Sequence, residues 1–158
     1  MIENRNAVRI VELPACKMVS SGAMNDFEIF VRFNEWFTAY SKSHSGDFYP
    51  HNFMWSDTDG KMVWNYAVSE IPEDIGGFEV IDFAGGLYAA AISVDADGED
   101  HDKVLDGIKE WVSNSGCFEL DETYIRRSIG TITSPESTKE IMGYAQMDLL
   151  FPIKIKSV

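Results

Sequence analysis

The stretch VELPACKMV, residues 11–19, decides how the fold of this chain is predicted. It starts with an apolar, an acidic and an apolar residue, passes through small residues at Pro14-Ala15, and finishes with apolar residues. A second stretch, IDFAGGLYA at residues 81–89, has the same order of residue types at a sequence offset of 70 (81 minus 11). Similarity at a fixed offset is typical of structural repeats, so the sequence predicts a duplicated fold.

Each of these stretches precedes a segment with apolar residues at helical spacing. The first segment is FEIFVRFNEWFTAY, where Asn25 or Asp26 can cap the start of the helix. The second is HDKVLDGIKEWVSNSG, with Asp100 as the expected N-cap and Gly116 as the expected stop. Two helices are therefore predicted, one in each repeat.

Strands are predicted between and after these helices. Two β-rich runs at about residues 52–57 and 61–69 flank the dipeptide Asp59-Gly60, which suits a hairpin turn. A strand is also expected across residues 117–130, CFELDETYIRRSIG, and a last strand in AQMDLLFPIKIK near the end of the chain. Each repeat then reads strand, helix, strand, strand.

The predicted organisation is a single domain over residues 1–158. Repeat one covers about residues 8–69, residues 70–77 form a linker, and repeat two covers about residues 78–156. The fold class is α+β: two strand-helix-strand-strand repeats related by a pseudo-twofold, with antiparallel sheets and helices on one face. A ligand cleft is expected between the halves, because such seams are frequent binding places.

Composition narrows the possible functions. The chain has 26 acidic and 13 basic residues, a net charge of −13, and direct nucleic-acid binding is not expected because it relies on concentrated positive charge. The 2 cysteines lie far apart and outside any zinc-binding spacing, so a reduced, cytoplasmic protein is expected. No motif or ligand spacing for a metal or another cofactor is found, and no membrane-spanning stretch.

The strand expected at residues 117–130 raises a question about function. Alternation places Glu122, Tyr124 and Arg126 on one face and Thr123 and Ile125 on the other. The first face is either exposed to solvent or lines a pocket. A carboxylate in an apolar, aromatic pocket would favour a bulky cation, unless Arg126 pairs with it.

Several segments together resemble the GyrI-like small-molecule-binding domain, the effector-binding domain of AraC-type and MerR-type transcription regulators. They are RIVELPACKMVSSG, FMWSDTDGKMVWNYAV, FAGGLYAAA, the Glu-x-Tyr at residues 122–124 and MDLLFPIKI. The resemblance extends from about Val8 to Lys156 and rests on the order and spacing of these segments.

The resemblance implies an aromatic cleft in which a buried acidic residue faces lipophilic cations. That acidic position matches Glu122, with Tyr124 beside it, and a second acidic position of the family is Asp148 here. The aromatic residues expected near the cleft are Trp55, Trp64, Tyr66, Phe83 and Tyr88.

The expected function is binding of small lipophilic, cationic aromatic molecules, by an effector sensor or a sequestering protein. Regulators of this class carry a DNA-binding part, so the expected partners are a small-molecule ligand and a DNA-binding domain upstream or on another chain. One alternative is a detoxifying hydrolase of strained cyclopropanoid compounds, with Glu122 as general base and Tyr124 as its hydrogen-bonding partner. A third is a gyrase-inhibitor-like protein interaction through the acidic surface.

Overall fold

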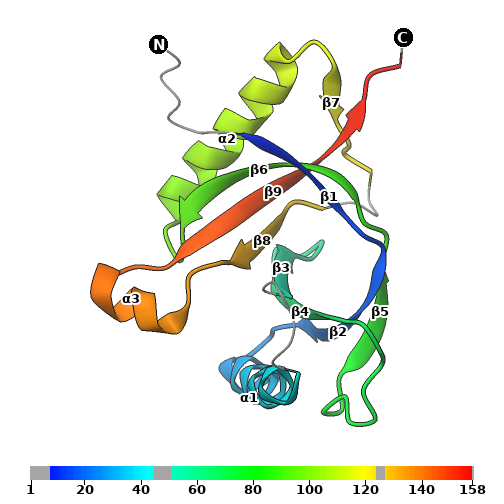
Figure 1. The fold of residues 1–158 in the computed structure, drawn as a ribbon, viewed down its shortest axis with the longest axis vertical. Helices are drawn as coiled ribbons and strands as arrows, with labels where there is room; N and C mark the ends of the chain where they lie inside the picture. Colours follow the sequence, from blue (N-terminus) through cyan, green and yellow to red (C-terminus); the bar gives the residue numbers. More distant parts are fainter. Residues whose placement is uncertain (1–7, 45–50, 124–126, 158) are drawn as a thin grey trace. The chain divides into compact units, whose positions relative to one another are not determined.

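The computed structural model describes residues 8–44, 51–123 and 127–157 (Figure 1). By its internal contacts the chain divides into two compact units. The central unit is Ala15–Phe83, and the terminal unit combines Met1–Pro14 with Ala84–Val158. Each unit has an antiparallel sheet and one long helix, as the predicted α+β class requires. Within the described ranges, no helix combines the length and the apolar character that a membrane crossing needs.

The central unit contains one helix on a four-stranded sheet. Its elements are β2 (Cys16–Ala23), α1 (Phe27–Ser43), β3 (Asn52–Ser56), β4 (Met62–Val68) and β5 (Glu79–Phe83), and the strand order is β3-β4-β2-β5. Asp26 is the N-cap of α1, because its side chain accepts a hydrogen bond of 3.0 Å from the Ile29 N–H. The predicted first helix and the predicted hairpin strands are thus confirmed.

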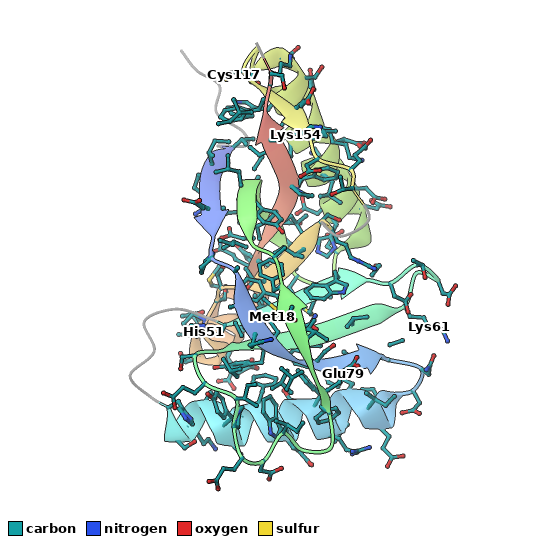
Figure 2. All side chains as sticks on the ribbon, turned by 90° about the vertical axis from the view of Figure 1, so that its right-hand side faces the viewer. Met18, His51, Lys61, Glu79, Cys117 and Lys154 are labelled. Atoms are coloured by element: carbon teal, nitrogen blue, oxygen red, sulfur yellow. The ribbon has the colours of Figure 1, made fainter. Side chains whose placement is uncertain are left out.

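The core of the central unit lies between α1 and one face of this sheet. Phe33 of α1 packs against Val19, Trp64, Tyr66 and Val68, and all five side chains are buried. Figure 2 shows side chains filling the layer between α1 and the strands. Because side chains alternate along a strand, the neighbours of these residues point to the opposite face, which no helix of this unit covers.

The terminal unit repeats this design with two additional short elements, β7 (Phe118–Leu120) and α3 (Glu136–Met142). Its other elements are β1 (Arg9–Leu13), β6 (Gly86–Val94), α2 (Gly98–Asn114), β8 (Ile129–Ile132) and β9 (Gln146–Ile155). The strand order is β1-β6-β9-β8, and β7 also pairs with β9. Val104, Ile108 and Val112 are the buried residues of α2, and its Lys109 lies above the ring of Phe151 in β9.

The start of α2 corrects the expected cap. The N-cap is Asp97, whose side chain accepts a hydrogen bond of 3.0 Å from the Asp100 N–H. Asp100 lies in the first turn, where its carboxylate accepts hydrogen bonds from the Ser93 hydroxyl (2.6 Å) and the Val94 N–H (2.9 Å) of β6. Asp100 was the wrong cap because its carboxylate accepts hydrogen bonds from β6. Asp97 caps the helix, since its carboxylate accepts a hydrogen bond from an N–H group of the first turn.

Strand pairing follows the predicted repeat. Val11 pairs with Tyr88 in the terminal unit. Adding the offset of 70 to the first number and subtracting it from the second gives Ile81 and Met18, which pair in the central unit. The pairing therefore has the offset that was read from the sequence. Both apolar stretches are divided between the units, the first after Pro14, which has no N–H for a ladder, and the second after Phe83. The compact units therefore differ from the sequence repeats.

The strand expected over residues 117–130 is interrupted. β7 ends at Leu120, which pairs with Ile153, and β8 begins at Ile129, which pairs with Leu150. Asp121 adds one main-chain hydrogen bond to Pro152, and residues 122–123 and 127–128 belong to no strand. The continuous strand was a wrong prediction, because the partners of Leu120 and Ile129 in β9 lie only three positions apart, too close for an unbroken pairing of residues 117–130 with β9.

Candidate functional site

Three aromatic rings meet on the helix-free face of the central sheet. Phe53 and Trp55 come from β3, and Phe83 comes from β5. The ring centroid of Phe83 lies 6.3 Å from that of Phe53 and 6.4 Å from that of Trp55, with the ring planes 13° and 16° from parallel. β4 and β2 separate the two strands in the sheet, a distance of about 14 Å at ordinary strand spacing. The rings of this three-ring cluster therefore meet above β4 and β2.

The residues below the three-ring cluster are fully buried. Met18 and Asn65 have no exposed surface and Ser20 is 2% exposed. Asn65 pairs across the strands with Phe53 on one side and with Ser20 on the other. The site thus has an aromatic cover and a buried polar row made of Ser20 and Asn65.

Asn65 carries an unsatisfied polar atom. Its side-chain N–H₂ faces the main-chain carbonyls of Phe53 (3.3 Å) and Val63 (3.5 Å). Two carbonyl acceptors on that side fix the orientation of the amide, because its own oxygen would be repelled there. The amide oxygen has no hydrogen-bond partner among the described residues. A buried acceptor without a partner costs about 1–3 kcal/mol, so this oxygen requires an explanation.

A thiol lies at the Phe83 end of the site. Cys16 pairs with Phe83 across the first position of β2 and is half-buried. Burial raises the pKa of the Cys16 thiol, because the thiolate is the charged form. The other cysteine, Cys117, is exposed in the terminal unit.

The structure brings together two of the aromatic residues predicted from the sequence, Trp55 and Phe83. It adds Phe53, which the sequence analysis did not select. The signal was present, because Phe53 lies two residues before Trp55 in the same predicted strand and must share its face. Asn65 was also missed, since no sequence pattern identifies a buried amide.

Trp64 and Tyr66 lie on the other face of β4, in the core under α1. The Trp64 ring stacks on Phe30 at 5.2 Å, and the Tyr66 ring stacks on Phe37 at 5.6 Å. Register explains the difference, since Trp64 is paired with Met54, one position away from Trp55. These rings are committed to the hydrophobic core.

In the terminal unit, Tyr88 and Asp148 lie on the sheet face away from α2. Tyr88 is 1% exposed. The Asp148 carboxylate is 2.6 Å from the Arg9 guanidinium, with side-chain exposures of 13% and 46%. Thr131 pairs with Asp148, and its buried hydroxyl has no partner among the described residues. The negative charge of Asp148 is therefore balanced by Arg9 within this unit.

The Glu-x-Tyr segment is only partly described. Glu122 lies beyond the end of β7 and is exposed, whereas its neighbour Asp121 is 9% exposed. The Asp121 N–H donates to the carbonyl of Pro152 at 2.8 Å, which prolongs the pairing of β7 with β9 by one residue. Tyr124 and Arg126, predicted on the same face as Glu122, lie outside the described residues.

The central unit also has a hollow of about 520 Å³ on the other side of its core. The hollow lies between the second half of α1, including Trp36 and Tyr40, its C-cap His44, and the loop of residues 69–74. None of the site residues predicted from the sequence lines it. In the described residues, no group of three or more His, Cys, Asp or Glu side chains is placed to hold a metal ion.

Comparison with known proteins establishes the fold. A scan of family models and a search of curated proteins gave no match. The C-terminal domain of EcmrR superposes with a TM-score of 0.65 at 13% identity, over 95% of this chain and 98% of that domain. SAV2435 bound to tetraphenylphosphonium superposes with a TM-score of 0.52 at 14% identity, over 93% of each chain. The chain has the GyrI-like fold.

The GyrI-like fold is shared by proteins of different description. A hydrolase from Listeria innocua matches with a TM-score of 0.65 at 15% identity, over 93% of this chain and 91% of the hydrolase. In the EcmrR–DNA complex, the match has a TM-score of 0.64 at 12% identity and covers 96% of this chain but 58% of EcmrR. The GyrI-like fold therefore leaves the function to be argued from the site.

Proposed function

We propose that this chain binds small lipophilic cations that carry aromatic rings, as an effector-sensing or sequestering protein. The observation that carries the proposal is the three-ring cluster of Phe53, Trp55 and Phe83, whose side chains are all half-buried on the sheet face that no helix of the central unit covers. The face of an aromatic ring attracts cations, by about 0.5–2 kcal/mol per ring. Small-molecule sites combine such apolar walls with a few polar groups.

Two further observations support a cationic ligand. The net charge of −13 raises the concentration of cations at the surface. SAV2435, which shares the fold, was solved with tetraphenylphosphonium, a lipophilic cation with four aromatic rings. Both agree with a site that recognises positive charge and aromatic surface.

The acids predicted from the sequence remain proposals. Glu122 is a proposed anionic contact, exposed where a cation can reach it, with Tyr124 as its proposed partner. Asp148 is a proposed secondary acid whose charge Arg9 balances. Tyr88 remains a proposed wall residue, and we propose the aromatic wall without Trp64 and Tyr66 because their rings fill the core under α1.

We also propose that the protein acts with a DNA-binding part, either upstream or on another chain. In the EcmrR–DNA complex, the match covers only 58% of the EcmrR chain, so the remainder of EcmrR lies outside the part that this chain resembles. Direct DNA binding by the acidic chain itself is not proposed.

Isothermal titration with a pair of planar ligands tests the proposed function. N-methylacridinium carries a fixed positive charge, and acridine at pH 8 has nearly the same shape without it. We expect the cation to bind at least about tenfold more tightly, as one to two cation–π contacts provide. Trp55→Leu should remove most of this affinity, whereas Trp111→Leu, which alters a tryptophan of α2 that is 37% exposed, should leave it unchanged.

Equal affinity for both ligands would contradict the cation preference. Unchanged binding by Trp55→Leu would contradict the three-ring cluster as the binding place. Glu122→Gln tests the acid separately: weaker binding of N-methylacridinium with unchanged binding of acridine is expected, and no change would remove Glu122 from the proposal.

A further inference from the structure

We propose that Asn65 selects ligands by their N–H groups, so that the preferred class is protonated aromatic amines over cations without N–H. The inference deepens the proposed function and rests on it, because Asn65 is the cross-strand neighbour of Phe53 on the sheet face of the three-ring cluster. Asn65 would act as a specificity-determining residue by accepting a hydrogen bond from the ligand.

The geometry leaves the buried amide oxygen of Asn65 available as an acceptor. The N–H₂ of Asn65 is used by the carbonyls of Phe53 and Val63, at 3.3 and 3.5 Å. The amide oxygen points away from these carbonyls and has no partner in the described part of the chain. Its residue has no exposed surface, so solvent does not satisfy the oxygen as it would at the surface. An N–H donor beside Phe53, the cross-strand neighbour of Asn65, would satisfy it.

The terminal unit shows that the fold does not need an amide at this position. The repeat offset of 70 relates Ser20 of β2 to Ala90 of β6. Ser20 pairs with Asn65, and Ala90 pairs with Leu150. Leu150 therefore holds in the terminal unit the place that Asn65 holds in the central unit, and both side chains are buried. Where one repeat packs an apolar pair, the other keeps a polar pair.

The rest of the polar row favours a donor that carries positive charge. Ser20 is the cross-strand neighbour of Asn65 and also pairs with Glu79 of β5. By alternation Glu79 lies on the same helix-free face, and the residue is exposed. Glu79 lies two strands from Asn65, about 10 Å across the sheet at ordinary strand spacing. A protonated amine bound over Asn65 would thus have this carboxylate on the same side of the sheet.

Titration calorimetry with two acridine cations tests the role of Asn65. Protonated 9-aminoacridine offers N–H donors, whereas N-methylacridinium has the same planar ring system and charge without any N–H. We expect the parent chain to prefer the amine and Asn65→Leu to weaken its binding by about tenfold or more, as loss of a hydrogen bond to a charged group does. Binding of N-methylacridinium should change less than about twofold. Leucine is the matched replacement because Leu150 occupies the equivalent position.

Controls separate the role of Asn65 from its contribution to folding. Ser20→Ala removes a neighbouring polar group and should change the ratio of the two affinities less than Asn65→Leu does. If Asn65→Leu does not fold, as judged by its thermal transition, Asn65→Ala replaces it. With either variant, an unchanged ratio of the two affinities overturns the inference.

The outcomes distinguish this inference from the proposed function. If the parent chain binds neither cation, the proposed function fails. If it binds both equally, or if both affinities fall together in the variant, the proposed function stands and the selective role of Asn65 is overturned. A selective loss of the amine alone supports the assignment.

Discussion

Two carboxylates of the terminal unit are held by different kinds of partner. Asp100 accepts hydrogen bonds from neutral donors, the Ser93 hydroxyl at 2.6 Å and the Val94 N–H at 2.9 Å. Asp148 faces the charged guanidinium of Arg9 at 2.6 Å. The first arrangement fixes the helix α2 to strand β6, and the second balances a charge on the sheet, so we expect different responses to pH and to mutation.

Replacing Asp100 should loosen the start of α2. The hydrogen bonds from Ser93 and Val94 lower the pKa of Asp100 below its ordinary value of 3.8. A lowered pKa in the folded state stabilises the fold above the ordinary value, and this stabilisation is lost as the pH falls through the lowered pKa. We expect Asp100→Asn to reduce the free energy of unfolding at pH 7 by about 1–2 kcal/mol.

Urea unfolding at several pH values measures this effect. Asp102→Asn is the matched control, because Asp102 is exposed on the same helix and its replacement changes the net charge equally. The difference in free energy of unfolding between Asp100→Asn and the parent chain should shrink as the pH falls below about 3.8. A difference that is constant with pH, or equal to that of Asp102→Asn, would contradict the proposed anchor.

The ion pair between Arg9 and Asp148 is testable by a double-mutant cycle. Arg9→Leu leaves a carboxylate that is 13% exposed without its partner. We expect the free energy of unfolding to fall by about 1–2 kcal/mol. This loss is smaller than for a fully buried pair, because Arg9 is half-exposed. Asp148→Asn in the Arg9→Leu background should recover part of this loss, and additive effects of the two changes would show that the pair is not coupled.

Single residues were the hardest level to predict from the sequence. The choice between Trp55 and Trp64 as ligand wall depends on a shift of one position, which exchanges the two faces of a strand. The sequence predicted both near the cleft. The face becomes known only when the partner strand and the covering helix are known, as in the pairing of Trp64 with Met54 under α1.

At the scale of elements, the loop between β4 and β5 is fixed by a glycine. Gly76 has a φ of +63°, and a Cβ atom there would lie 2.7 Å from Cδ1 of Trp36. The Trp36 indole N–H also donates to the carbonyl of Asp74 at 3.1 Å. The loop is therefore held against the rigid ring of α1, and a side chain at Gly76 has no room.

Gly76→Ala should destabilise the chain by about 2–3 kcal/mol, through left-handed strain and displacement of the Trp36 ring. Gly60→Ala is the matched control, since Gly60 has a φ of +77° and no atom within 4 Å of the added Cβ. It should cost about 1 kcal/mol, from the backbone alone. Chemical denaturation of both variants measures the difference, and equal losses would show that the contact with Trp36 is unimportant.

Elements with strong local signals were predictable. The helix from Phe27 to Ser43 has regular apolar spacing and an aspartate cap, and the β3–β4 hairpin has an Asp-Gly turn. Residues 117–130 were not predictable in the same way. Their interruption depends on how many residues separate the partners Ile153 and Leu150 in β9, which is a property of distant pairing.

At the scale of the whole molecule, the excess of acidic residues should oppose folding through mutual repulsion. The net charge is −13 over 158 residues. Salt screens such repulsion, with a Debye length of about 30 Å at 0.01 M and about 8 Å at 0.15 M. From 0.01 M to 0.15 M salt, we expect the free energy of unfolding to increase by roughly 1 kcal/mol. The melting temperature should then rise by a few degrees. Calorimetry in NaCl measures it, and a fall in melting temperature would contradict the prediction.

The overall architecture was accessible from the sequence because a repeat constrains many contacts at once. The offset of 70 read from residues 11–19 and 81–89 reappears in the pairing of Val11 with Tyr88 and of Met18 with Ile81. The division into compact units was not accessible in this way. It depends on which half of each apolar stretch pairs with which strand, and both halves have the same composition.

Because Cys16 lies at one end of the three-ring cluster, the rate at which its thiol is alkylated can report ligand binding without any added label. In a Cys117→Ser background Cys16 is the only thiol, opposite Phe83 at one end of the three-ring cluster. Burial and the raised pKa of its thiol should make alkylation by iodoacetamide at pH 7 slower than at Cys117 in the reciprocal variant. A ligand seated beside Phe83 would slow it further, so occupancy could be followed as a rate of covalent modification.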